Sequence, residues 1–286
     1  MIKQIYSSFC YLGTILFLAT ACSSPETALP KKTPKVEEPV SMTIANTDSM
    51  NKTNKEAQIE MDSSISKKDL IGDFEPAKHA DFTLIEKQYA SREGMYLRKD
   101  AYASFIKMAA AAKKDNIDFV IKSATRNFAA QKVIWEGKWN GTRLLEGGTN
   151  AAKKFPKPNE RALKILEYSS MPGTSRHHWG TDIDLNAFVN SYFEKGKGLK
   201  EYEWLLAHAA EYGFCQPYTK KGAERPDGYN EEKWHWSYLP IATKLTNQYQ
   251  LRIKDADIAG FEGAEVAKDI EVIRKYVLGI NGECLK

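Results

Sequence analysis

The chain has 286 residues, 42% of them hydrophobic, and a formal net charge of +4 at neutral pH. A charge this close to balance argues against a nucleic-acid-binding protein, whose domains are usually much more basic. The length is sufficient for one well-packed domain with additional terminal segments, and no internal repeat is visible.

The first 21 residues have the pattern of a secretion signal. Lys3 gives an early positive charge, an apolar run follows at 11–18, and small residues precede Cys22. The run is shorter than the ~20 residues of a membrane-spanning helix. Cys22 stands where a bacterial lipoprotein carries its lipid, although Ala19 occupies the usual leucine position. We expect an exported, lipid-anchored protein facing the periplasm or cell wall; the alternative is an ordinary signal with an incidental cysteine.

Residues 22–75 have the composition of a flexible tether. Aromatic residues are absent between Cys22 and Phe74, and Pro, Ser, Thr and charged residues dominate segments such as 31–39. Such a segment cannot bury enough apolar surface to offset the entropy of ordering it. The globular domain is therefore predicted at 76–286, and the location of every tryptophan between Trp135 and Trp236 places the expected core and site there.

Apolar spacing predicts a mixture of helices and strands within this domain. Helices are expected at about 100–113, 128–139, 160–168 and 202–212. Strands are expected at 117–121, 180–185 and 234–238, the second of them half-buried because polar and apolar residues alternate. The Gly- and Lys-rich stretch 142–158 is typical of an inserted loop. This irregular order predicts a single compact α+β domain with a small antiparallel sheet flanked by helices.

Two cysteines remain once Cys10 and Cys22 are assigned to the signal and the anchor. Cys215 and Cys284 form an even pair in an expected exported protein, where disulfides persist. The sequence leaves open whether they form a bridge or are two separate buried thiols.

Histidines and carboxylates are concentrated in two segments of the domain. His177 is followed by Asp182 and Asp184, and Glu232 precedes His235 by three residues. Two imidazoles and a carboxylate suit Zn²⁺, and a catalytic zinc site uses three protein ligands plus a water. Asp182 and Asp184 project from the same face of the expected strand, so geometry permits either as the ligand. Glu232 could take a proton from the bound water; the alternative is histidines that are only packed or hydrogen-bonded.

The order of these residues resembles a known family. The segment PGTSRHHWGTDID at 172–184 is followed by EKWHW at 232–236. Ser123, Arg126 and Gln131 stand upstream, with further matches at 202–205 and 212–214. Together these segments resemble the VanY-type D-alanyl-D-alanine carboxypeptidases, which belong to the hedgehog-like group of zinc peptidases. The resemblance extends from about 117 to 238 and implies the fold of that group.

The resemblance also implies roles for individual residues. One Zn²⁺ would be held by His177, Asp184 and His235, which selects Asp184 over Asp182. Glu232 matches the general base, and Arg126 matches the arginine beside the scissile carbonyl. The residues assigned to substrate binding are Ser175, Gln131, Ser123, Trp234 and Trp236, with a purely structural role as the alternative for the two tryptophans.

Three positions depart from the pattern of the resembled family. Asp182 stands where alanine is usual, Trp179 replaces a smaller residue, and Ser237 occupies a position where arginine often follows the Trp-His-Trp element. These departures leave the metal ligands and the base intact but affect the substrate preference that the resemblance implies.

The function expected from the resemblance is removal of the terminal D-alanine from peptidoglycan stem peptides by a zinc-activated water. The expected partners are those stem peptides and, through the lipid anchor, a membrane; no nucleic acid is expected. The alternatives are an L,D-carboxypeptidase, a D,D-dipeptidase or a wall endopeptidase of the same group, and an inert zinc-containing domain that binds the cell wall.

Overall fold

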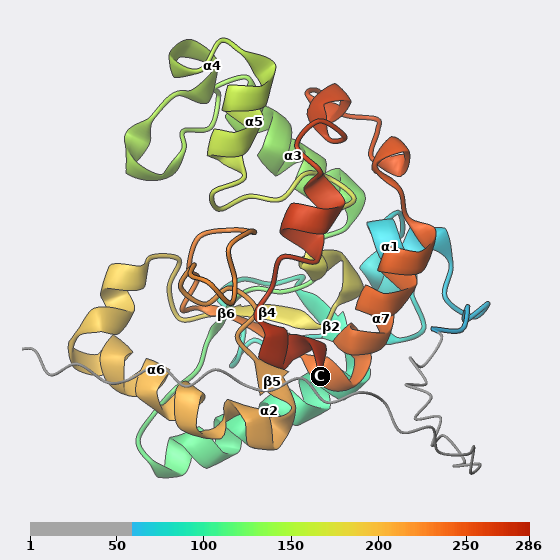
Figure 1. Ribbon diagram of the computed structural model, residues 1–286. Coiled ribbons are helices and arrows are strands. Elements are labelled where there is room, and N and C mark those ends of the chain that lie inside the picture. Colours follow the sequence, from blue (N-terminus) through green and yellow to red (C-terminus); the bar gives the residue numbers. More distant parts are fainter. Residues whose placement is uncertain (1–58) are drawn as a thin grey trace, which may run out of the picture. The chain divides into compact units, whose positions relative to one another are not determined.

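The computed structural model of the protein describes residues 59–286 (Figure 1). The signal segment, Cys22 and the tether up to residue 58 lie outside the described residues. The helices are α1 (Lys67–Ile71), α2 (Lys99–Lys114), α3 (Phe128–Trp139), α4 (Ala151–Lys154), α5 (Pro158–Ile165), α6 (Gly196–His208) and α7 (Leu239–Arg252). The strands are β1 (Phe82–Leu84), β2 (Tyr96–Arg98), β3 (Ile121–Ser123), β4 (Asp182–Leu185), β5 (Phe214–Cys215) and β6 (His235–Tyr238). Within 59–286, no helix has both the length and the hydropathy needed to cross a bilayer.

A four-stranded antiparallel sheet in the order β3-β4-β6-β5 occupies the middle of the domain, and β1 and β2 form a separate antiparallel pair. In the pairing of β4 with β6, Asp184 is opposite His235 and Ile183 is opposite Trp236. Because side chains alternate along a strand, the first pair faces one side of the sheet and the second pair faces the other. The central strands are therefore polar on one face and apolar on the other.

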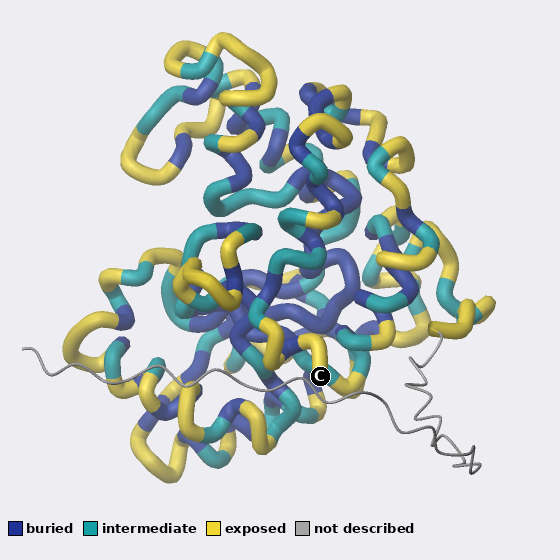
Figure 2. Tube along the Cα trace, viewed as in Figure 1, coloured by how far each residue is buried: buried dark blue, intermediate teal, exposed yellow. Residues whose placement is uncertain are grey.

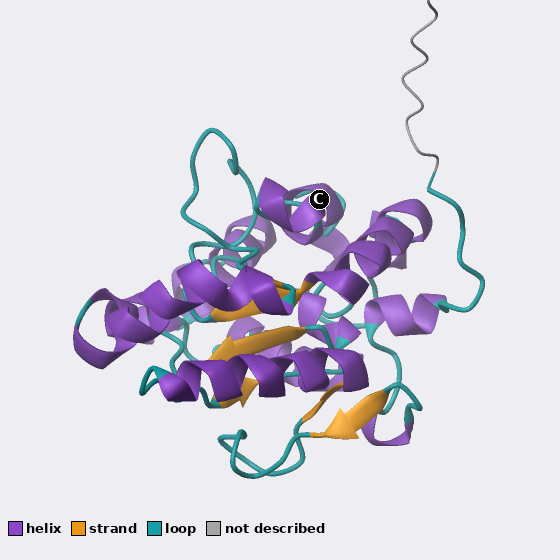
Figure 3. Cartoon of the chain, turned by 90° about the horizontal axis from the view of Figure 1, so that it is seen from below, coloured by secondary structure: helices purple, strands orange, loops and turns teal. Residues whose placement is uncertain are grey.

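The apolar face is covered by α2 and α6, which run alongside the strands (Figure 3). Phe105 of α2 and Leu205 of α6 belong to the same buried cluster as Ile183 and Trp236. The periodic apolar stripe of α2 supplies this contact, since its other face carries lysines and solvent-exposed residues. Burial of this cluster fixes the orientation of β4 and β6, and so directs Asp184 and His235 to the opposite side.

The second buried cluster is built from α3, α5, α7 and the C-terminal segment. Its largest members include Trp135, Trp179 and Tyr249, which are completely or almost completely buried. The polar face of the sheet is enclosed rather than solvated, and every residue of β4 is buried (Figure 2). The expectation of a half-buried strand at 180–185 is therefore wrong, because protein covers both faces.

The domain begins earlier than residue 76. Leu70 of α1 is fully buried in the second cluster, and its carbonyl accepts a hydrogen bond from Trp179 Nε1 at 3.0 Å. Ser66 and Asp69 form a reciprocal cap that starts the helix. Residues 59–75 are thus part of the folded domain and not of a tether, because one buried leucine offsets their otherwise polar composition.

The predicted helices agree with α2, α3, α5 and α6 to within a few residues, except that α6 begins earlier, at Gly196. The predicted strand at 117–121 is displaced to Ile121–Ser123. Val120 N donates a hydrogen bond to the side chain of Asn186 at 2.7 Å. The backbone N–H of Val120 therefore bonds a side chain and not the backbone of a neighbouring strand. The stretch 142–158, expected to be a loop, contains the short helix α4.

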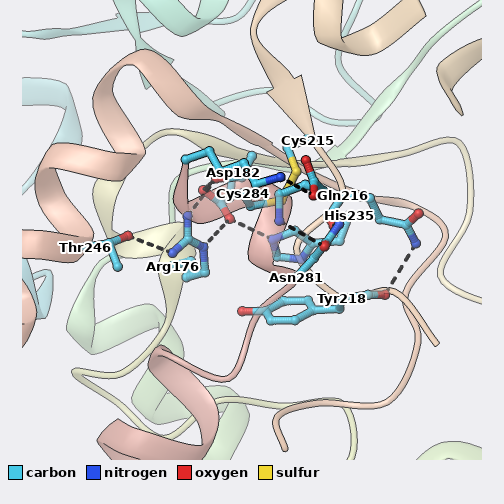
Figure 4. Close-up of a disulfide and its surroundings, with 12 residues drawn as sticks. Arg176, Asp182, Cys215, Gln216, Tyr218, His235, Thr246, Asn281 and Cys284 are labelled. Atoms are coloured by element: carbon cyan, nitrogen blue, oxygen red, sulfur yellow. Dashed lines mark hydrogen bonds and ion pairs between the residues drawn. A yellow bond between two sulfur atoms is a disulfide. The ribbon is translucent and has the colours of Figure 1, made fainter. Parts of the chain in front are cut away.

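Cys215 of β5 and Cys284 near the C-terminus form a disulfide, with 5.7 Å between their Cα atoms (Figure 4). Next to it, Asn281 N donates to Pro217 O at 2.8 Å. The C-terminal segment is thereby held against the start of the connection from β5 to β6.

Candidate metal centre

Three side chains with metal-binding atoms meet at the paired strands β4 and β6. Asp184 and His235 are cross-strand neighbours, and His177 comes from a 3-10 helical turn, Arg176–Trp179, that leads into β4. One potential ligand atom from each residue lies within 4.8 Å of the other two. All three side chains are buried. One strand pairing thus brings together Asp184 and His235, which are far apart in the sequence, and the turn before β4 adds His177.

Two atoms of this cluster lack the hydrogen bonds that buried polar atoms normally make. His177 Nδ1 lies 2.8 Å from Ala124 O, which leaves Nε2 directed at Asp184 Oδ2, 3.3 Å away. His177 Nε2 and Asp184 Oδ1 are buried without a hydrogen-bond partner. Because such orphaned atoms are uncommon in folded proteins, and two imidazoles with one carboxylate form a common donor set for zinc, the residues present fit a divalent metal ion.

His235 is surrounded by carboxylates. Its Nδ1 lies 3.1 Å from Glu232 Oε2 and 3.3 Å from Asp184 Oδ1, and its Nε2 lies 2.9 Å from Asp182 Oδ2. Burial lowers the pKa of the imidazole, but the hydrogen bonds to Asp182 and Glu232 and the charge of Asp184 outweigh it and raise the pKa to about 10. The excess of negative charge therefore favours a cation at this point, whether a proton or a metal ion.

Glu232 stands beside the cluster with its carboxylate buried. Burial raises the pKa of this carboxyl group, although the hydrogen bond with His235 opposes the shift. Its backbone is fixed on both sides, because Glu232 N donates to Tyr218 O at 2.9 Å and Glu232 O accepts from Gln216 Nε2 at 3.1 Å. A carboxylate with a raised pKa in this position is suited to exchanging a proton with a group at the metal site.

Arg126 brings a positive charge to the same place. Burial lowers the pKa of its guanidinium, while the charges of Asp184 and Glu232 raise it. Its Nε is buried without a hydrogen-bond partner. An arginine held in this way is available to a negatively charged group of a ligand.

His178 holds the backbone of Arg126, a role that the sequence did not suggest. Gly173 N donates to His178 Nε2 at 3.0 Å, so His178 Nδ1 carries the proton and donates to Arg126 O at 2.6 Å. Burial lowers the pKa of His178 to about 3, which keeps the ring neutral. Arg126 N in turn donates to His177 O at 3.2 Å. The two adjacent histidines thus have different environments: His177 faces the candidate metal cluster, and His178 positions the backbone of Arg126.

A cavity of about 400 Å³ opens onto the cluster. Its wall near the metal site is formed by Ser123, Arg126, His177, Asp184, Glu232 and Trp234. Further out it is lined by four cations, Arg92, Lys122, Lys138 and Arg143, and by the single carboxylate Glu146, which pairs with Lys138 at 2.7 Å. The cavity is therefore suited to a ligand that carries negative charge.

Comparison with known proteins identifies the family. The model of the VanY family, described as D-alanyl-D-alanine carboxypeptidase, matches residues 94–241, just over half of the chain. The chain belongs to the VanY family. The matched region contains all three side chains of the candidate metal cluster, as well as Glu232 and Arg126.

Several known proteins are similar to the chain. A D-alanyl-D-alanine carboxypeptidase of Enterococcus faecalis is 28% identical over 141 residues, which are 48% of this chain and 47% of the relative. The chain thus spans about half the length of this relative. Among solved structures, the Zn(II) complex of a vancomycin-resistance D,D-pentapeptidase VanY is 22% identical, with a TM-score of 0.44 over 61% of this chain and 88% of that one. The LD-carboxypeptidase LdcB is 23% identical, with a TM-score of 0.44 over 72% and 81%.

Not every residue that was expected to bind substrate lines the cavity beside the candidate metal cluster. Ser123 and Trp234 line it, whereas Trp236 is on the opposite face of β6 and packs in the core under α2 and α6. The expectation for Trp236 is therefore wrong, because strand alternation turns its side chain away. Gln131 and Ser175 are almost fully buried outside the cavity wall, and Gln131 Nε2 donates to Ser170 O at 2.7 Å.

Proposed function

We propose that the protein is a zinc-dependent D,D-carboxypeptidase that removes the terminal D-alanine from peptidoglycan stem peptides. The observation that carries the proposal is the buried cluster of His177, Asp184 and His235, whose orphaned donor atoms lie beside Glu232 at the base of a cavity. Membership of the VanY family supports the same reaction.

The metal would be held by His177 Nε2, Asp184 and His235 Nδ1, the atoms that converge in the cluster. Bound there, zinc supplies a Lewis acid that lowers the pKa of a water toward ~7 and polarises the scissile carbonyl. Burial of all three side chains keeps bulk water from competing for these donor atoms.

Glu232 is the proposed general base. Its carboxylate accepts the proton of the attacking water and later delivers that proton to the amine of the departing D-alanine. Burial raises the pKa of Glu232 and so brings it closer to the pKa values of the attacking water and the departing amine. A smaller difference in pKa makes the transfer of the proton to and from Glu232 easier. The backbone hydrogen bonds at Tyr218 and Gln216 hold the carboxylate in place between the two steps.

Arg126 is proposed to stabilise the negative charge that develops on the scissile carbonyl oxygen. Its free Nε can donate to that oxygen, and its backbone is fixed by hydrogen bonds to His177 and His178. The cations farther out, such as Lys122 and Arg143, attract the carboxylates of the peptide.

The proposal is tested by measuring D-alanine release from a pentapeptide stem with the purified protein. We expect release that a chelator abolishes and that added zinc restores. Glu232→Gln should reduce kcat by about 10²–10⁴-fold, because it removes general base catalysis, while zinc remains bound. Glu231→Gln, which removes the neighbouring carboxylate, is the matched control and should leave release unchanged.

Digestion of whole muropeptides with mass readout distinguishes the other reactions of this group. Loss of D-alanine from tetrapeptides would indicate an L,D-carboxypeptidase, and cleavage of cross-links would indicate an endopeptidase. Hydrolysis of free D-Ala-D-Ala, supplied as a separate substrate, would indicate a D,D-dipeptidase. If the zinc-loaded protein leaves all of these substrates intact, the catalytic proposal fails in favour of a zinc-containing domain that binds the cell wall.

We propose further that the protein is exported and anchored through a lipid on Cys22. Support comes from the apolar run and small residues that precede Cys22, and from the disulfide, because disulfides persist in oxidising compartments. Metabolic labelling with a fatty acid tests this directly: label should be incorporated into the wild type and lost in Cys22→Ser. Equal labelling of both would refute the anchor.

A further inference from the structure

Asp182 is a second carboxylate on the polar face of β4, and it contacts the metal cluster only through His235. It is completely buried, and in the strand pairing it lies opposite Ser237, two positions from Asp184. Its Oδ2 lies 2.9 Å from His235 Nε2 (Figure 4). It is therefore placed to act on the imidazole from the side away from the cavity.

The contact determines which nitrogen of His235 is free. A carboxylate can only accept, so His235 Nε2 carries the proton and donates it to Asp182. The other nitrogen, Nδ1, lies 3.1 Å from Glu232 Oε2, so the proton on Nδ1 is the one that a bound metal would replace, and its lone pair would then face the metal. Nδ1 is the atom that lies 3.3 Å from Asp184 Oδ1, on the side of the metal cluster. Asp182 thus selects the tautomer that can bind a metal.

The carboxylate of Asp182 is itself held by hydrogen bonds on both oxygens. Oδ1 accepts from Thr181 Oγ1 at 2.7 Å and from Ser237 Oγ at 2.8 Å. Oδ2 accepts from Arg176 Nε at 3.2 Å in addition to His235. With both oxygens engaged twice, the group cannot rotate without losing bonds, so its direction toward His235 is fixed.

Arg176 balances the buried charge and links the network to α7. Its guanidinium donates to Ser237 Oγ at 2.9 Å and to Thr246 Oγ1 at 3.0 Å, and it lies over the ring of Trp179 at 4.7 Å (Figure 4). Thr246 Oγ1 donates onward to Ala242 O within the helix. The side chains of Arg176 and Asp182 are both completely buried, and they form an ion pair with each other. Neither buried charge is therefore left unpaired.

We propose that Asp182, supported by Arg176, is a positioning residue of the metal centre: it fixes the tautomer and the orientation of His235 so that Nδ1 faces the metal. The inference rests on the proposed zinc site. Carboxylates that hydrogen-bond the second nitrogen of a metal-binding histidine generally affect affinity by about 10–100-fold. Asp182 contacts neither the cavity nor the other two ligands, so its effect should pass through His235 alone.

The test measures zinc affinity by competition with a chromogenic chelator. Asp182→Ala alone would strand the charge of Arg176, so the principal variant is Asp182→Ala with Arg176→Met, which removes the ion pair as a unit. We expect zinc binding to weaken about 10–100-fold. Asp182→Asn with Arg176→Met, which keeps the shape of the side chain next to His235, should give a smaller loss in the same direction. Thr246→Val is the matched control: it removes a hydrogen bond to Arg176 without touching His235 and should keep wild-type affinity.

A second readout follows the tautomer itself. In ¹⁵N NMR spectra of the zinc-loaded wild type, His235 should bind through Nδ1 and carry its proton on Nε2, whereas the zinc-loaded double variant should show a mixture. Wild-type affinity together with an unchanged tautomer in the double variant would overturn the inference. A wild type that binds zinc but releases no D-alanine would refute the proposed function only, whereas a wild type that binds no zinc would refute both.

Discussion

Gly180 lies between His177 and Asp184, the proposed metal ligands, and has a backbone φ of 67°, in the left-handed region. A Cβ at this position would meet the ring of Phe82 at 2.3 Å. Gly94 has a similar φ of 74°, but a Cβ there would meet nothing within 4 Å. Both glycines therefore have a left-handed backbone conformation, and they differ only in the space that a Cβ atom would find.

We predict that Gly180→Ala destabilises the protein more than Gly94→Ala. The left-handed backbone alone costs about 1–2 kcal/mol for alanine, and overpacking against Phe82 should add about 1–3 kcal/mol at Gly180. Urea unfolding of the two variants measures the difference. Equal losses would mean that Phe82 moves aside freely.

At this scale the sequence predicts the chemistry better than the supporting contacts. Residue type and spacing indicated His177, His235 and Glu232 but left Asp182 and Asp184 open, and the family resemblance selected Asp184; the structure brings these four side chains together. The roles of His178 and Arg176 depend on which carbonyl or carboxylate lies next to each side chain in the folded chain, and no spacing in the sequence encodes that.

Among the elements, the short helix α1 is attached to the domain by one buried side chain. Leu70 is fully buried, while the side chain of Lys68 in the same helix is 74% exposed. Leu70→Ala should lower the free energy of unfolding by about 2–5 kcal/mol through the cavity that it leaves. Lys68→Ala should change it by less than about 1 kcal/mol, since its pairing with Asp73 is on the surface.

Thermal or denaturant unfolding of both variants checks this prediction. If Leu70→Ala lowered the free energy of unfolding no more than Lys68→Ala, residues 59–75 would belong to the tether and not to the folded domain. Composition misplaced this boundary because it averages over a window in which a single leucine is outnumbered by polar residues. The strand at 117–121 was displaced for a related reason: Ile117 and Phe119 are buried as a strand would be, but the hydrogen bonds that define pairing depend on Asn186 and β4.

For the molecule as a whole, the disulfide closes a segment with a sequence separation of 69 that contains Glu232, His235 and all of α7. In the chain-entropy model a loop of this size stabilises the fold by about 4 kcal/mol. Near the bridge, Asn281 donates to Gln216 O at 3.3 Å, and the side chain of Gln216 holds the backbone of Glu232. The disulfide therefore supports the position of Glu232, the proposed general base, as well as the stability of the fold.

We predict that Cys215→Ser with Cys284→Ser lowers the midpoint of thermal unfolding, and that a reductant lowers the midpoint of the wild type to the same value. The double variant should not respond to reductant, which separates loss of the bridge from general effects of the reagent. A wild type whose unfolding is unaffected by full reduction would contradict the prediction.

The buried pair of Arg176 and Asp182 also restricts how this sequence can evolve. Loss of either residue alone leaves an unpaired charge with no access to water, a change that is commonly worth several kcal/mol. Drift at the two positions must therefore proceed in pairs, or begin with a neutral residue at both. Relatives that lack an acidic residue at the position of Asp182 should also lack the arginine at the position of Arg176, and an ancestral lineage is expected to have gained the two within a short interval.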